Sequence, residues 1–83
     1  AQRLCIEQAK LHPLEPEVHR LLGIILVARG ALKEAEAALR RALYLAPGDD
    51  EALGHLALLA ERVGHPEQAA ALRRRRGAQQ ESP

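Results

Sequence analysis

The sequence has no phenylalanine, tryptophan or methionine, and its single aromatic residue is Tyr44. A core built on aromatic rings is therefore excluded, although 47% of the 83 residues are hydrophobic. The interior must consist of leucine, alanine, isoleucine and valine, and a composition rich in alanine and leucine favours helix. A chain of this length forms one small domain. The composition therefore predicts a single all-α domain.

The sequence also has little cysteine and little net charge. Its one cysteine, Cys5, excludes an internal disulfide, which is typical of a reducing compartment, and we expect the thiol to be a small buried apolar group. Basic and acidic residues are interspersed and give a net charge of +1, which does not suit a chain built to bind nucleic acid. We therefore expect a cytoplasmic protein without a nucleic-acid partner.

Long apolar runs are absent as well. The longest extends from Leu21 to Ala28, far short of the ~20 residues that span a bilayer. No charged-then-apolar signal segment opens the chain. We expect no membrane contact, and because the chain starts without methionine we expect it to be a piece of a longer protein.

The residue groups that carry common enzyme and metal chemistry are missing. His12, His19, His55 and His65 do not pair at a spacing of three or four residues, and no cysteine pair accompanies them. We therefore predict no metal and no cofactor. No nucleophile–base pair, carboxylate dyad or glycine-rich phosphate loop is present, so we expect no catalytic residues and no enzyme activity in this chain.

What the sequence does contain is an internal repeat. Pro13 and Pro47 lie 34 positions apart, and so do Gly30 and Gly64. A period of this size, made of helix–turn–helix units, is the signature of a helical repeat array. Prolines that start helices and glycines that end them divide the chain into five expected helices. These cover residues 1–11, 16–29, 32–45, 51–63 and 66–76.

The repeat boundaries predict one domain over residues 1–76 and a flexible tail over residues 77–83. The domain is expected to contain the second helix of a truncated repeat (1–13), a full repeat (16–47) and a last repeat (50–76). The first helix would then have an uncovered apolar face.

Several residues have expected structural roles within these helices. We expect Gly30 to adopt a left-handed helix cap and Gly23 to let the next helix approach closely. Asp49 or Asp50 is expected to cap the fourth helix. The buried stripe of the third helix is predicted to be Ala35, Ala38, Leu39, Ala42 and Leu43.

The spacing resembles that of the tetratricopeptide repeat (TPR), whose pattern W-x2-L-G-x2-Y is followed by A-x3-F and a proline. The central repeat has His19, Leu22, Gly23 and Leu26, then Ala35 with Leu39, and then Pro47. The resemblance covers residues 1–76 and implies an all-α, right-handed superhelix of about two and a half repeats and five helices. TPR arrays are scaffolds for peptides and proteins, so the resemblance implies a protein-interaction module.

TPR proteins typically bind a partner segment along the concave surface formed by the first helix of each repeat. Transferred by position, this groove consists of Glu17, Arg20, Ile24, Val27, Ala28, Glu51, Gly54, Leu58, Glu61 and Arg62. Its middle is aliphatic, and Arg20, Glu61 and Arg62 place charges at its edges. This pattern favours an amphipathic or aliphatic protein or peptide segment.

A narrower resemblance lies in the run ALYLAP (42–47) followed by EALGHLALL (51–59). It is similar to the C-terminal TPR segment of CheR-type chemoreceptor methyltransferases of bacterial chemotaxis. The resemblance implies that an upstream domain of the parent protein methylates receptor glutamates with S-adenosyl-L-methionine. It also implies that this segment modulates docking to a chemoreceptor or to the parent's own catalytic domain. Tyr44 is the most telling residue, because the general TPR pattern does not require an aromatic residue there.

Two features leave alternatives open. The run Arg73–Arg76 is predicted to give the last repeat a polar outer surface and to complement a helix dipole, rather than to bind nucleic acid. Contact of this run with an acidic partner surface is the alternative. The uncovered first helix offers a second alternative, which is self-association into a weak homodimer, as in an assembly scaffold of an unrelated cytoplasmic TPR protein.

Overall fold

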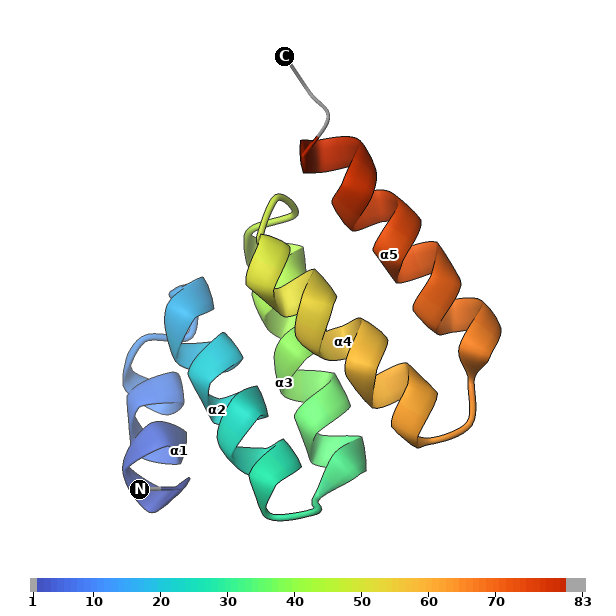
Figure 1. Cartoon of the computed structure of the whole chain (residues 1–83). Coiled ribbons are helices and arrows are strands. Elements are labelled where there is room, and N and C mark those ends of the chain that lie inside the picture. Colours follow the sequence, from blue (N-terminus) through green and yellow to red (C-terminus); the bar gives the residue numbers. More distant parts are fainter. Residues whose placement is uncertain (1, 81–83) are drawn as a thin grey trace.

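The computed structural model describes residues 2–80, and these form helices joined by short turns (Figure 1). The helices are α1 (Gln2–Leu11), α2 (Pro16–Ala28), α3 (Leu32–Leu45), α4 (Asp50–Arg62) and α5 (Pro66–Gln80). The predicted all-α class with five helices is confirmed. None of the helices in the described part of the chain is long and apolar enough to cross a membrane.

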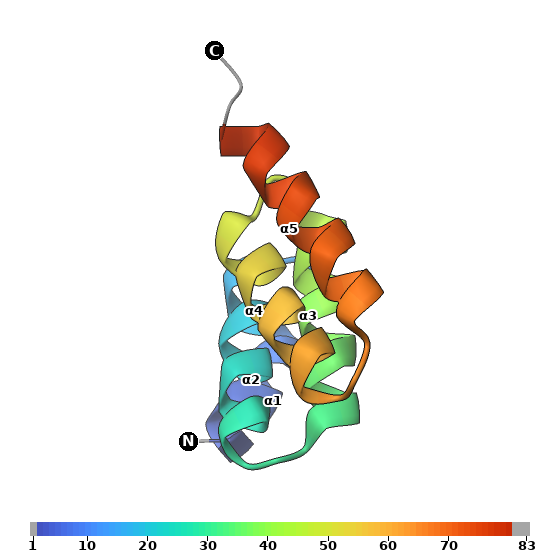
Figure 2. The same ribbon diagram turned by 45° about the vertical axis from the view of Figure 1, so that its right-hand side comes forward.

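The helices form two layers. Each packs against the next one along the chain, and α2 also contacts α4. As a result α2 and α4 lie side by side in one layer, and α1, α3 and α5 make up the other (Figures 1 and 2). The molecule is flat and measures 35 × 31 × 15 Å. Antiparallel neighbours in two layers are the arrangement expected of a helical repeat array.

The core consists of leucine and alanine. The stripe predicted for α3 is buried, and α4 faces it with a second buried set, which is Ala52, Leu53, Leu56, Ala57, Leu59 and Ala60. Among the residues whose side chains the structure describes, no polar or charged residue is buried as a whole, although the side chain of Asp49 is only 7% exposed. Each buried leucine contributes roughly 1.5–3 kcal/mol to folding, whereas each alanine mainly lets two helices come close together.

Glycines end α2 and α4 in the same way. Gly30 has φ 80° and Gly64 has φ 85°, both in the left-handed region. After α2, the amide of Ala31 donates a hydrogen bond of 2.9 Å to the carbonyl of Leu26, and the amide of His65 bonds in the equivalent place after α4. This is the Schellman cap. Its recurrence 34 residues later shows that the sequence repeat is a structural repeat.

Gly23 lies where α2 and α3 approach each other closely. A Cβ atom at this position would lie 2.6 Å from Cγ of Leu39 and 2.8 Å from its Cδ2. Leu39 is fully buried, so its side chain has no open space to move into. The predicted role of Gly23 is confirmed.

The expected end of the last helix at Gly77 is wrong, because α5 continues to Gln80. Gly77 lacks the positive φ with which glycine ends α2 and α4. It is followed by alanine and glutamine, which are good helix formers, so nothing locally stops the helix. The rest of the expected tail, residues 81–83, lies outside the described residues, and so does the side chain of Cys5.

Gly23→Ala and Gly77→Ala make the same chemical change in two helices and are expected to have opposite effects. Alanine in place of helical glycine gains up to about 1 kcal/mol of helix propensity. Nothing lies within 4 Å of a methyl group added at Gly77, so we expect the free energy of unfolding to rise by about 0.5 kcal/mol. At Gly23 the added methyl overpacks the core, which costs roughly 1–3 kcal/mol, so we expect a net loss. Urea denaturation followed by circular dichroism measures both, and a stabilised Gly23→Ala variant would contradict the close packing.

Candidate functional site

The ten residues predicted to form a groove all lie on α2 and α4, and none of them is fully buried. We call them together the α2–α4 surface. Leu58 is 61% exposed in the middle of a helix whose other leucines are buried. Val27, in contrast, packs partly against the core. The surface therefore offers an exposed apolar centre with charged residues around it.

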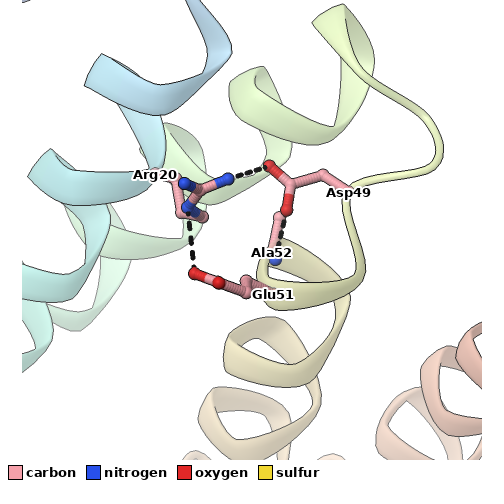
Figure 3. Close-up of polar contacts among 4 residues, drawn as sticks. All are labelled: Arg20, Asp49, Glu51 and Ala52. Atoms are coloured by element: carbon pink, nitrogen blue, oxygen red, sulfur yellow. Dashed lines mark hydrogen bonds and ion pairs between the residues drawn. The ribbon is translucent and has the colours of Figure 1, made fainter.

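Arg20 joins the two helices of this surface (Figure 3). Its Nη1 donates a hydrogen bond of 2.8 Å to Oδ2 of Asp49, and its Nε lies 3.3 Å from Oε2 of Glu51. The other carboxylate oxygen of Asp49 accepts a hydrogen bond of 3.1 Å from the amide of Ala52. Asp49 is thus the N-cap of α4 and also the ion-pair partner of α2. The hydrogen bond with Asp49 raises the pKa of Arg20.

Most of the charges predicted at the edges of the surface are engaged within the chain. Arg20 and Glu51 pair with each other, and Glu61 pairs with Arg73 of α5. Arg62 makes no ion pair within residues 2–80. Of the predicted edge charges, Arg62 is therefore the one best able to attract a ligand of opposite charge.

Arg76 covers the position of Gly54. A Cβ atom on Gly54 would lie 2.6 Å from Nη1 of Arg76, so the guanidinium fills the space that a side chain would take. Nε of Arg76 donates to Oδ1 of Asp50 over 2.8 Å, and this hydrogen bond raises the pKa of Arg76. Gly54 is therefore not an open part of the groove. The sequence did not reveal that Arg76 covers Gly54, because Arg76 and its partner Asp50 lie 26 positions apart.

The opposite layer contains a groove that the sequence reasoning missed. It runs between α1 and α3 with α2 as its floor, and its volume of ≈ 630 Å³ is that of a typical ligand pocket. Its apolar lining includes Ile6, Leu22 and Leu26, and His19 lies at its end. Nε2 of His19 donates a hydrogen bond of 2.9 Å to the carbonyl of Pro13. The sequence contained one signal for this groove: His19 and Leu26 occupy positions where the TPR pattern has large aromatic side chains, which would fill it.

Comparison with known proteins gives a family match and similar folds. Residues 16–49 match the tetratricopeptide repeat family model. The solved structure of MamA AMB-1 is 26% identical, with a TM-score of 0.91, over 100% of this chain and 45% of the MamA chain. A MamA point mutant is also 26% identical, with a TM-score of 0.89, over 95% of this chain and 58% of that one. The chain thus spans about half the length of these structures. No curated protein matches.

These findings agree with the geometry described above. The matched residues cover α2, the turn after it and α3, and they end at the cap of α4. The similarity to MamA extends over all five helices. Residues 16–49 therefore match the tetratricopeptide repeat in sequence, and the five helices show TPR-like packing.

Two substitutions at Asp49 separate its capping role from its ion pair. An asparagine side chain at this position would still cap α4 but would lose the charge that Arg20 needs, so we expect Asp49→Asn to lower the free energy of unfolding by about 1 kcal/mol. Asp49→Ala removes both interactions and is expected to cost about 2 kcal/mol. Urea denaturation measures the two values. An Asp49→Asn variant as stable as the unaltered chain would mean that the contact with Arg20 adds nothing to stability, and equal losses in the two variants would mean that the cap adds nothing.

Proposed function

We propose that this chain is a protein-interaction module that binds a partner segment on the α2–α4 surface. The exposure of Leu58 is the observation that carries the proposal. Leu58 is 61% exposed although the other leucines of α4 are buried, and the same surface includes Ile24, Ala28 and charged residues. An apolar patch bordered by polar residues is typical of an interaction site. The match to the tetratricopeptide repeat supports protein partners in general.

The size and charge of the surface indicate what kind of ligand it accepts. Its apolar centre suits an amphipathic or aliphatic segment, and Arg62 favours an acidic residue at the edge of that segment. Two helices offer a small interface, so a single site is expected to bind weakly and to gain affinity when it is combined with other sites. We place this activity in the cytoplasm, on the basis of the single cysteine.

A narrower proposal concerns the parent protein. The resemblance to CheR-type methyltransferases rests on residues 42–47 and 51–59 alone, and it would make a chemoreceptor or the parent's catalytic domain the partner. The two solved structures described above are MamA structures, and this favours the alternative of an unrelated TPR protein. An S-adenosylmethionine-dependent activity of the parent therefore stays a prediction from that short resemblance.

The test uses matched charge insertions on two surfaces. Peptides selected from a random phage-displayed library on the immobilised chain are expected to be rich in aliphatic residues. Their binding should fall at least about tenfold in Leu58→Glu, because a carboxylate placed in the apolar centre must be desolvated. Leu14→Glu makes the same change at a leucine that is 74% exposed in the turn between α1 and α2, outside the α2–α4 surface, and is expected to leave binding unchanged. Fluorescence anisotropy of labelled peptides gives the affinities.

Two outcomes of this test would contradict the proposal. One is equal binding to the unaltered chain and to Leu58→Glu, which would place the peptide elsewhere. The other is an equal loss in both variants, which would indicate non-specific apolar adsorption. Circular dichroism confirms that each variant stays helical before it is compared.

Self-association is the second candidate, and exposed leucines near the N-terminus favour it. Leu4 is 60% exposed and Leu11 is 70% exposed on α1, and Leu14 follows them in the next turn. Leu4 and Leu11 belong to the helix that the repeat boundaries predict to have an uncovered apolar face. A second copy that covered these leucines would remove them from water.

Sedimentation velocity over a concentration series tests this candidate. If the N-terminal leucines pair, the sedimentation coefficient rises with concentration in the unaltered chain and in Leu58→Glu but not in Leu14→Glu. A coefficient that is independent of concentration would exclude self-association in the range tested. A rise that persists in Leu14→Glu would assign the contact to another surface.

A further inference from the structure

A pocket in the second layer lies away from the α2–α4 surface and combines apolar, aromatic and cationic groups. It is formed by the end of α3, the turn that follows and α5, and its volume is ≈ 440 Å³. The lining residues are Arg40, Leu43, Tyr44, Pro47 and Arg75. Leu43 is buried and belongs to the core, so the floor of the pocket is held in place by the fold.

Tyr44 contributes little to the fold and is available to a ligand. Its side chain is 80% exposed, although it is the single aromatic residue of the chain. Tyrosine offers a large, rigid ring with a polar end, and for that reason it is enriched among residues that dominate binding interfaces. An aromatic ring that is left outside an alanine and leucine core is therefore explained by binding better than by packing.

The arginine run divides into two residues that act structurally and two that do not. Arg73 pairs with Glu61, and Arg76 pairs with Asp50, so these two hold α5 against α4. Arg74 and Arg75 are exposed and make no ion pair within residues 2–80. The ion pairs with α4 therefore account for only half of the run, and Arg74 and Arg75 form the exposed polar part of the last repeat.

The helix dipole does not account for Arg74 and Arg75. Because α5 extends to Gln80, the arginines do not lie in its last turn, and that turn has no basic residue. The stabilisation of cations by the dipole falls off within one turn of the helix end. The same holds for Arg40 and Arg41 of α3, whose last turn also has no basic residue.

We propose that the Tyr44 pocket, defined by its five lining residues, binds an acidic segment of a protein partner in which an apolar side chain is flanked by Asp or Glu. The apolar side chain would contact Leu43, Pro47 and the ring of Tyr44. Carboxylates would pair with the guanidinium of Arg75, whose planar fork suits them. Arg40 already pairs with Glu36 at 3.1 Å and contributes less.

A nucleic acid fits this pocket less well than an acidic protein segment does. One ring can stack with one base, and the few unpaired arginines allow few phosphate contacts. The proposal is independent of the α2–α4 surface, so the chain would hold two partners, one on each layer.

Tyrosine fluorescence can be used to test binding at the Tyr44 pocket. Because Tyr44 is the only tyrosine and tryptophan is absent, the emission of the full chain reports on this pocket alone. The probe is a synthetic peptide of Glu, Asp and Leu, and its counterpart with Lys in place of the acidic residues is the control. We expect a saturable change in emission with the acidic peptide, weaker at high salt because the charges are screened.

Three variants localise the site. Arg75→Glu is expected to weaken binding of the acidic peptide about fivefold or more, since an attraction becomes a repulsion. Arg29→Glu changes the net charge equally at an exposed residue in the turn after α2 and should leave binding unchanged. Leu58→Glu should also leave it unchanged, which keeps this result separate from the test of the α2–α4 surface.

The following results would overturn the proposal. Equal weakening in Arg75→Glu and Arg29→Glu would show a general effect of net charge, and an unchanged tyrosine emission would place the peptide elsewhere. Equal binding of the lysine peptide would remove the role of the arginines. Tighter binding of single-stranded oligo(dT), again lost in Arg75→Glu, would make the pocket a nucleic-acid site.

Discussion

The close approach of helices through glycine and alanine is the constraint on which the rest of this structure depends. Gly23 leaves room for the buried side chain of Leu39, and Ala35, Ala42 and Ala52 are fully buried. Small residues at these contacts let the two helix layers share one core of leucines, and the molecule is only 15 Å thick. The same constraint leaves no space in the interior for a large ring. The one aromatic residue is accordingly on the surface, where it can serve binding.

Charged residues have two separate uses in the molecule. Between α2 and α4, ion pairs of Arg20 with Asp49 and Glu51 join consecutive repeats, and Asp49 also caps α4. On α5, Arg73 and Arg76 reach back to α4 and cover the last repeat. These pairs lie partly in solvent, so each adds modestly to stability, but together they reduce the number of charges left for a partner. Arg75, which lines the Tyr44 pocket and makes no ion pair within residues 2–80, is one of the exceptions.

The candidate site was predictable in position but not in chemistry. The 34-residue register placed all ten groove residues on α2 and α4, because position within a repeat determines which helix and which face a residue occupies. It did not show that Arg20 is paired, that Gly54 is covered by Arg76, or that Tyr44 and Arg75 share a pocket. Each of these depends on side chains more than 20 positions apart, for which helical periodicity contains no information.

The sequence by itself determined the class, the number of helices and most of their ends. Proline at the start of α2, the left-handed glycines after α2 and α4 and the cap at Asp49 act through the local backbone, within a few residues of where they stand. Gly77 shows the limit of that reasoning, since glycine ends a helix only when it takes the left-handed conformation. Which charges are paired, which leucines stay exposed and where grooves open between helices was decided by the tertiary structure. Burial and ion pairing are properties of the assembled helices, and they follow from the distances that packing creates between residues remote in the chain.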